Sequence, residues 1–175
     1  MAALKNKLIF IIGGARSGKS RHALQLSQAF QKKAFVATAV VTDEEMRARI
    51  QKHQTQRGPE WRTFEEPYEI ASLIRKEAAN FDLMLLDCLT FWISNLLLKY
   101  EDGSSVMNQI TRLKDHLKQR TCSFIIVTNE VGSGIVPESP LARRFRDLAG
   151  TANQEIAVIA DQVFLTVAGI PLEIK

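Results

Sequence analysis

Short apolar runs alternate along the chain with longer stretches in which apolar residues recur every three or four positions. Continuous runs bounded by turn residues are typical of buried parallel strands, whereas the longer spacing is typical of helices with one buried face. The runs predicted as strands are Leu8–Ile12, Lys33–Ala39, Trp61–Glu65, Phe81–Asp87, Ser123–Thr128 and Val163–Val167. The stretches predicted as helices start at Arg21 or span Asp43–Arg57, Pro67–Ala79, Leu89–Lys99, Val106–Leu117 and Ser139–Ala160.

The order of these elements, with strands and helices alternating, predicts an α/β fold. Its sheet is expected to be mainly parallel and to have helices on both faces. After the last run, Gly169-Ile170-Pro171 predicts a turn into Leu172–Ile174, and so a C-terminal antiparallel hairpin. The chain has 175 residues, enough for one core of this kind, and no repeat or low-complexity linker divides it.

The first strand leads into a glycine-rich stretch, Gly13-Gly14-Ala15-Arg16-Ser17-Gly18-Lys19-Ser20, which matches G-x-x-x-x-G-K-[ST] without a gap. In such a loop, glycines let backbone N–H groups surround an anion, and the helix N-terminus that follows adds partial positive charge. Lys19 is predicted to contact the β- and γ-phosphates of a nucleotide, and the Ser20 hydroxyl to bind Mg²⁺. Residues 1–175 are therefore expected to form a single P-loop nucleotide-binding catalytic domain.

A carboxylate closes the predicted strand Phe81–Asp87, which is otherwise mostly apolar. A charge at the end of a buried strand needs a partner. An acidic residue in this position, downstream of a P-loop, is expected to anchor the same magnesium ion as the loop hydroxyl. We therefore predict that Ser20 and Asp87 form the metal site.

The predicted helix that ends near Arg57 carries a histidine whose role the pattern leaves open. Met46, Ile50, His53 and Arg57 follow each other at spacings of four, three and four, so they share one face. A histidine that extends an apolar stripe is more often a hydrogen-bonded core residue than a catalytic one. Imidazole is nevertheless a neutral nucleophile near pH 7 that can attack phosphorus and leave again.

Composition narrows the choice of partners. The net charge of +4 and the pI near 9.2 are mildly basic, but the basic residues are scattered, so nucleic acid is not expected as a partner. The cluster Arg143, Arg144 and Arg146 fits a solvated face and a phosphate clamp equally well.

No membrane span or cleavable signal is expected. Cys88 and Cys122 fall in or beside apolar runs, which favours buried, reduced thiols in a cytoplasmic protein.

Several stretches together resemble one protein family. Besides the P-loop string, they are Arg49–His53 with Arg57, Trp61–Glu65, Thr128–Glu138, and Arg143–Gly150 with Asn153. These stretches resemble the bifunctional adenosylcobinamide kinase/adenosylcobinamide-phosphate guanylyltransferase family of cobalamin biosynthesis. The resemblance runs from the first strand to the C-terminal hairpin, and its motifs outside the P-loop are specific to the family.

This resemblance implies a two-step enzyme. The first step phosphorylates the aminopropanol hydroxyl of adenosylcobinamide with ATP or GTP. The second step transfers GMP from GTP to adenosylcobinamide phosphate, which gives adenosylcobinamide-GDP and pyrophosphate. The position that matches the guanylylated histidine of the family is His53, so the resemblance favours the catalytic interpretation over the core histidine.

The resemblance also implies a RecA-like fold, a homotrimer and a set of site residues. His53 and Lys19 are the implied catalytic residues, with Mg²⁺ as cofactor. The implied nucleotide-binding residues are Gly13, Gly14, Ala15, Arg16, Ser17, Gly18, Lys19, Ser20, Ala37, Thr38, Ala39, Gln54, Thr55, Gln56, Arg57, Glu65 and Asp87. The helix Leu89–Lys99 has more apolar surface than one sheet face needs, so part of it, or the hairpin, is expected at a subunit interface.

Three other classes of protein share the P-loop, and each would need different residues in the rest of the chain. A single-function P-loop kinase would not need His53. A regulatory GTPase is disfavoured, because the chain has no Asn-Lys-x-Asp guanine motif. A RecA-like ATPase that acts on nucleic acid would be expected to show a basic surface stripe with aromatic residues, and no such stripe is apparent.

Overall fold

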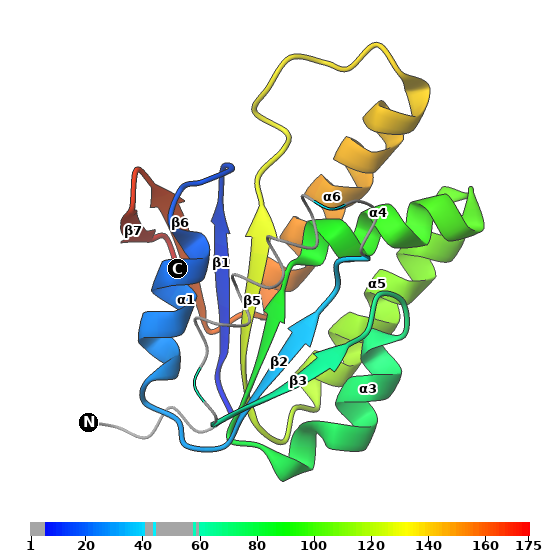
Figure 1. The fold of residues 1–175 in the computed structure, drawn as a ribbon. Coiled ribbons are helices and arrows are strands. Elements are labelled where there is room, and N and C mark those ends of the chain that lie inside the picture. The colour runs from blue at the N-terminus through cyan, green and yellow to red at the C-terminus, as the bar shows by residue number, and fades with distance from the viewer. Residues whose placement is uncertain (1–5, 41–43, 45–57, 59) are drawn as a thin grey trace.

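The described residues of the computed structural model, 6–40, 44, 58 and 60–175, include a seven-stranded sheet. The strand order is β3-β2-β4-β5-β1-β6-β7, so the first strand of the chain lies near the middle of the sheet (Figure 1). Neighbouring strands are parallel, except that β7 is antiparallel to β6. The strand bounds are β1 Leu8–Gly13, β2 Lys33–Ala37, β3 Trp61–Glu65, β4 Leu83–Asp87, β5 Ser123–Asn129, β6 Gln162–Val167 and β7 Ile170–Glu173.

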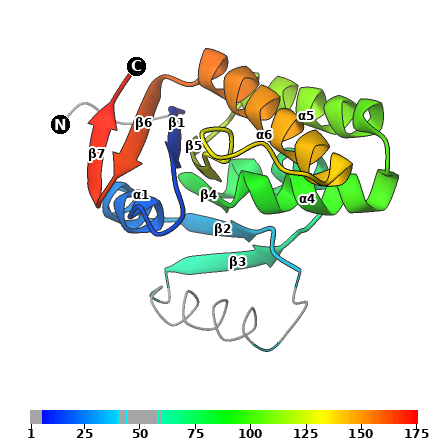
Figure 2. The same ribbon diagram turned by 90° about the horizontal axis from the view of Figure 1, so that it is seen from above.

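Helices cover both faces of this sheet, as the sequence predicts (Figure 2). Alternate side chains of each central strand enter two separate cores, because successive residues of a strand point to opposite faces. Leu8 and Phe10 of β1 pack in the larger core, and Ile9 and Ile11 pack in the smaller one against α1. The larger core also receives residues from the helices other than α1. The helix bounds are α1 Lys19–Ser27, α3 Ile70–Glu77, α4 Leu89–Tyr100, α5 Gly103–Lys118 and α6 Pro140–Ile159.

Several element boundaries differ from the predicted ones. α3 begins at Ile70 rather than at Pro67, because the Glu66 carboxylate accepts the N–H groups of Tyr68 and Glu69 and holds a turn there. α6 continues through Gly150 without a break. The hairpin turns at Ala168 and Gly169, where both residues have positive φ, and β7 already begins at Ile170.

Much of the apolar surface of α4 is buried within the chain, but Phe91 and Leu98 are 39 % and 65 % exposed. Leu89, Trp92, Ile93 and Leu96 are all completely buried in the larger core. The helix lies between the sheet and the helices α5 and α6, so it has apolar neighbours on more than one side (Figure 2). Because Phe91 and Leu98 are exposed, the expectation that part of α4 lies at a subunit interface stays a prediction.

The C-terminal hairpin differs from α4 in its exposure. No residue of β7 is buried. The exposed apolar residues of the hairpin region, which we call the hairpin patch, are Val158, Val167, Ile170, Leu172 and Ile174.

Within the described parts of the chain, no helix is both long enough and apolar enough to cross a membrane.

Candidate functional site

The P-loop connects the middle of the sheet to α1. β1 ends at Gly13, and α1 begins at Lys19, two residues before the predicted start, with Gly18 as its N-cap residue. Gly18 has a φ of 98°, a left-handed value that glycine adopts without steric cost. The Ser17 N–H donates to the Gly14 carbonyl at 3.2 Å and closes a tight turn. The loop thus leads directly into a helix N-terminus, where partial positive charge favours an anion.

Lys19 is a nearly buried cation within this loop. The residue is only 7 % exposed. The ammonium group donates to the Gly14 carbonyl at 2.6 Å and lies 3.5 Å from the Ser17 hydroxyl oxygen. Burial lowers the pKa of Lys19, and the nearby Asp87 carboxylate partly opposes this effect. A buried ammonium with only neutral oxygens as bonding partners is well suited to receive the charge of a phosphate group.

Ser20 and Asp87 meet at the carboxyl end of β4. The Ser20 hydroxyl donates to an Asp87 carboxylate oxygen at 3.4 Å. Mg²⁺ prefers hard oxygen ligands such as carboxylate and hydroxyl groups. The structure therefore brings together the two residues that the sequence predicts as metal ligands. Among the described residues, no cluster of three or more histidine, cysteine or acidic side chains offers another site of this kind.

Two further predicted site residues share the same sheet edge. Ala37 ends β2 and pairs with Asp87 of β4 on one side and with Glu65 of β3 on the other. Glu65 is exposed, so its carboxylate is accessible from solvent. Because parallel strands end at one edge, Ala37, Glu65 and Asp87 form a row that leads away from the P-loop.

Thr38, also predicted to bind nucleotide, has its polar groups engaged within the protein. It is completely buried, and its hydroxyl accepts the Cys88 N–H at 2.9 Å and donates to the Cys88 carbonyl at 2.8 Å. The Asn95 side-chain amide donates to the Thr38 carbonyl at 2.7 Å. These bonds join the ends of β2 and β4, and a nucleotide contact at Thr38 stays a prediction that they do not favour.

The predicted nucleophile lies outside the described residues. This applies to His53 and to Gln54, Thr55, Gln56 and Arg57. The chain leaves β2 at the same edge that carries Asp87, and it returns to the sheet at Trp61, the first residue of β3. The start of the connecting segment is therefore at the edge of the sheet where the P-loop lies.

A polar cluster at the end of β5 was not assigned a role from the sequence. The Asn129 side-chain amide donates to the Thr90 hydroxyl at 3.3 Å, and the Thr128 hydroxyl donates to the Asn153 side chain at 3.0 Å. Alternation along β5 puts Asn129 on the same face as Val127, which packs in the core beside α1. Register places Asn129 opposite Gly13. The sequence contains a signal for Asn129, because it is a polar residue at the end of a buried strand, as Asp87 is.

The loop after β5 is held by its own side chains and by α6. The Glu130 carboxylate accepts the N–H groups of Gly132 and Ser133, and hydrogen bonds from Ser133 lower its pKa. The Arg143 guanidinium donates to the carbonyls of Pro137 at 3.0 Å and Glu138 at 2.6 Å. Arg143 therefore fixes the end of this loop, a role that neither sequence interpretation of the arginine cluster included.

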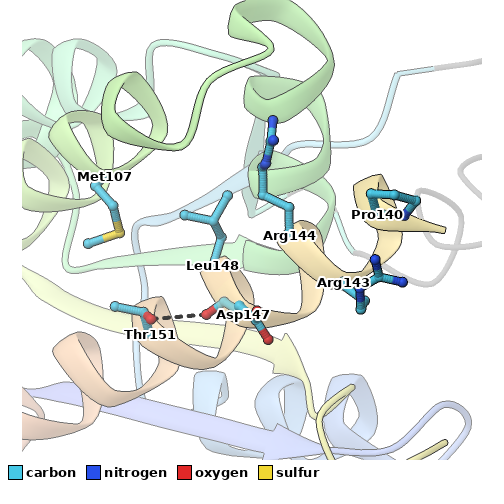
Figure 3. Close-up of a pocket in the computed structure, with 7 residues that line it drawn as sticks. All are labelled: Met107, Pro140, Arg143, Arg144, Asp147, Leu148 and Thr151. Atoms are coloured by element: carbon cyan, nitrogen blue, oxygen red, sulfur yellow. Dashed lines mark hydrogen bonds between the residues drawn. The ribbon is translucent and has the colours of Figure 1, made fainter. Parts of the chain in front are cut away.

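An open groove lies beside this loop, between α5 and α6 (Figure 3). Arg144, which faces the groove, donates to the Glu101 carbonyl at 2.8 Å. The Thr151 hydroxyl donates to the Asp147 carbonyl at 2.9 Å within α6. The groove encloses about 600 Å³ and is lined by Met107, Pro140, Arg143, Arg144, Asp147, Leu148 and Thr151.

The fold and the site together define a P-loop nucleotide-binding protein of the RecA-like class. Its first strand enters a glycine-rich loop and a helix, and an acidic residue ends the strand two places away in the sheet. The chain belongs to the cobinamide kinase / cobinamide phosphate guanyltransferase family, whose model matches residues 9–174.

Individual relatives agree with the family and with the fold. The bifunctional adenosylcobalamin biosynthesis protein CobU of Escherichia coli is 39 % identical over 96 % of this chain and 99 % of its own length. The bifunctional adenosylcobalamin biosynthesis protein CobP of Pseudomonas aeruginosa is 42 % identical over 94 % of this chain and 95 % of its own. The solved structure of the RadB recombinase is similar in fold alone, with a TM-score of 0.54 and 18 % identity, covering 92 % of this chain and 74 % of that one.

Proposed function

We propose that this chain catalyses both reactions of its family, first phosphorylating adenosylcobinamide and then transferring GMP from GTP to adenosylcobinamide phosphate. The observation that carries the proposal is the buried Lys19 ammonium in a P-loop whose next residue, Ser20, meets Asp87. Family membership supplies the identity of the acceptor, which no described contact identifies. ATP and GTP are both proposed as phosphoryl donors for the first reaction.

The P-loop can serve both reactions because each begins with a bound nucleoside triphosphate. Backbone N–H groups of residues 14–18 and the N-terminus of α1 attract the phosphate chain. On binding, the Lys19 ammonium exchanges the Gly14 carbonyl for phosphate oxygens, and so it neutralises charge that grows on the leaving group. In the kinase step, the acceptor hydroxyl attacks the γ-phosphorus and the bond to the β-phosphate oxygen breaks.

Ser20 and Asp87 would hold the Mg²⁺ that accompanies the nucleotide. Their oxygens are 3.4 Å apart, and both are of the type that Mg²⁺ prefers. When bound, the ion supplies positive charge next to the phosphate chain. Asp87 also lies close enough to Lys19 to affect its pKa, so the carboxylate contributes to both cations of the site.

For the second reaction we propose His53 as a covalent nucleophile. The imidazole attacks the α-phosphorus of GTP, so a phosphorus–nitrogen bond forms and the bond to pyrophosphate breaks. A phosphate oxygen of the acceptor then attacks the same phosphorus, and His53 leaves unchanged. Two displacements replace one difficult step, and GTP and the corrinoid phosphate need not be bound together.

The experiment that tests this proposal is the replacement His53→Asn, which keeps a polar side chain but removes the nucleophilic nitrogen. With GTP labelled at the α-phosphate, we expect wild-type protein to acquire acid-labile, base-stable label and to form adenosylcobinamide-GDP. His53→Asn should lose both, while phosphorylation of adenosylcobinamide largely survives because Lys19, Ser20 and Asp87 are unchanged. His116→Asn, on α5, is the matched control and should behave as wild type.

Two results would contradict parts of the proposal. Wild-type protein that makes adenosylcobinamide-GDP without label on His53 would replace the covalent route by direct transfer in the P-loop. Wild-type protein that transfers the γ-phosphate of ATP but never GMP would be a single-function kinase. Identifying the products by mass separates these cases.

The proposal also covers the assembly and the location of the enzyme. We propose a cytoplasmic homotrimer, with the hairpin patch as the surface that subunits share. The support is the exposure of Ile170, Leu172 and Ile174, each of which is at least 51 % exposed. Apolar residues grouped in this way are typical of interaction surfaces.

A further inference from the structure

The turn of the C-terminal hairpin is bonded directly to the P-loop, although about 150 residues separate them in the chain. The Gly169 N–H donates to the Ser17 carbonyl at 2.8 Å. The Arg21 guanidinium, in the first turn of α1, donates back to the Gly169 carbonyl at 3.1 Å. Figure 1 shows the hairpin beside the segment that joins β1 to α1.

The two backbones approach so closely that they leave little room for a side chain at Gly13 or Gly18. A Cβ atom on Gly18 would lie 3.0 Å from the Gly169 Cα, and one on Gly13 would lie 2.4 Å from the Thr166 carbonyl oxygen. Gly169 itself has a φ of +83° and is therefore in a conformation that side-chain-bearing residues rarely adopt. Glycine on both sides of the contact lets the backbones of the hairpin and the loop touch, and the Arg21 side chain adds one further bond.

The Gly169 bond fixes the direction of one amide of the phosphate cradle. A trans peptide unit is planar, so its carbonyl and its N–H point in opposite directions. The Ser17 carbonyl is held toward the hairpin by Gly169, and the Gly18 N–H of the same peptide unit therefore points away from the hairpin. Backbone N–H groups of this loop are the groups that surround nucleotide phosphates. An N–H whose direction is fixed before binding needs no reorientation when the phosphate arrives.

We propose that Gly169 and Arg21 are positioning residues for the nucleotide: the hairpin turn holds the P-loop in its phosphate-binding conformation. This inference rests on the proposed function for the identity of the nucleotide. It assigns a role to the last strands of the chain, which contain no P-loop residue. It also explains the position of the turn at Ala168 and Gly169, because this turn allows the Gly169 N–H to donate to the Ser17 carbonyl.

The test compares Gly169→Ala and Arg21→Ala with the control Glu173→Gln. Glu173 lies on β7 of the same hairpin, is exposed, and is not part of the hairpin patch. A Cβ at Gly169 would lie 2.7 Å from the Arg21 guanidinium, so Gly169→Ala disturbs both bonds of the contact, whereas Arg21→Ala removes only one. The probe is the GTP analogue with a methylene group between the α- and β-phosphorus, which cannot transfer GMP. Its dissociation constant is measured by calorimetry on the full-length proteins.

We expect Gly169→Ala to weaken binding of the analogue by about tenfold or more, and Arg21→Ala by about threefold, the scale of single hydrogen bonds near a charged ligand. In steady-state assays, KM for GTP should rise in the same order while KM for adenosylcobinamide stays constant. Glu173→Gln should match wild type in all three measurements. A purely structural role would lower the active fraction, and so the apparent kcat, without this selective change in KM.

Equal affinity of wild type, Gly169→Ala and Arg21→Ala for the analogue would overturn the inference, whatever the catalytic results. If Gly169→Ala does not fold, the decision passes to Arg21→Ala, because Arg21 is exposed and its replacement leaves the core intact. Wild type that binds the analogue but makes no adenosylcobinamide-GDP would refute the proposed function and leave the positioning role standing. Wild type that does not bind the analogue would overturn both.

Discussion

At the scale of single residues, the site depends on the Lys19 ammonium, which is largely buried from water and hydrogen-bonded only to neutral oxygens. Lys19 is held by the neutral oxygens of Gly14 and Ser17, and burial lowers its pKa. Desolvation of an ammonium is costly unless a charged partner arrives. The cost is offset when a phosphate binds, so the residue contributes more to nucleotide binding than an exposed lysine would.

Lys19→Ala should therefore abolish tight binding of nucleoside triphosphate and both proposed half-reactions. We expect kcat/KM to fall by at least about a hundredfold, because a buried charge-stabilising donor is lost. The measurement is the rate of each half-reaction with ATP and with GTP. Lys7→Ala, at an exposed lysine just before β1, is the control for the loss of a positive charge. Near-normal turnover of Lys19→Ala with either nucleotide would rule out the P-loop as the catalytic site.

Asp87→Asn tests the metal site without changing the size of the side chain. The amide keeps one oxygen near Ser20 but removes the negative charge that attracts Mg²⁺. We expect activity to fall at low Mg²⁺ and to recover partly when the Mg²⁺ concentration is raised. Asp115→Asn, at an exposed position on α5, should show wild-type dependence on Mg²⁺. Loss of activity that no Mg²⁺ concentration relieves would mean that Asp87 does not act through the metal.

At the scale of elements, the sequence predicts almost every helix and strand but not what each one packs against. The hydrophobic pattern correctly predicts burial on both faces of β1 and β4 and on one face of α5. For α4 the same signal led to the expectation of a subunit interface, which stays a prediction, because a sequence does not reveal how much of the helix α5 and α6 cover. The contact between Gly169 and Ser17 was missed for a related reason, since backbone bonds between distant segments leave no periodic pattern.

The same distinction, between local patterns and contacts with distant segments, applies to the residues of the site. Ser20 and Asp87 were predictable because each stands at a fixed place in a strand or loop motif. The buried role of Thr38 was not, because its hydroxyl bonds to the backbone of a different strand. Asn129 belongs to the first kind and could have been found, since it closes β5 in the same way that Asp87 closes β4.

The loop after β5 gives a prediction at this scale. Arg143 holds the carbonyls of Pro137 and Glu138, and the loop exposes Ile135 almost completely. Arg143→Ala should release the end of the loop, and thermolysin, which cleaves before large apolar residues, should cut it several-fold faster. We expect only a small change in the free energy of unfolding, about 1 kcal/mol, because the bonds lie at the surface.

Arg146→Ala is the matched control for the Arg143 experiment. Arg146 lies on the same helix, but its guanidinium contacts the neighbouring Asp147 at 3.4 Å rather than the loop. Cleavage at residues 130–139 should then match wild type. Equal cleavage rates for the two variants would show that the contacts of Arg143 do not restrain the loop.

At the scale of the whole molecule, the hairpin patch is the described surface that best fits a subunit contact. Wild-type protein should sediment as an oligomer at micromolar concentration, and a trimer is the number that the family implies. Leu172→Asp places a charge in the patch and should shift the protein toward the monomer, since burying an unpaired carboxylate is unfavourable. Thr111→Asp, at an exposed position on α5, is the control. A monomer for wild type would remove the assembly proposal.

The order of the strands in the sheet has a consequence for how the chain folds during its synthesis. β1 is made before its neighbours in the sheet, β5 and β6, and the turn that supports the P-loop follows β6. While the ribosome is still adding residues, the phosphate loop has no finished sheet to rest on. Contacts between distant parts of a chain form slowly, because loop-closure entropy opposes them. A nascent chain of this protein should therefore acquire affinity for nucleotide only after β5, β6 and the hairpin have been added, so GTP would bind and stabilise only chains in which the support of the P-loop is present.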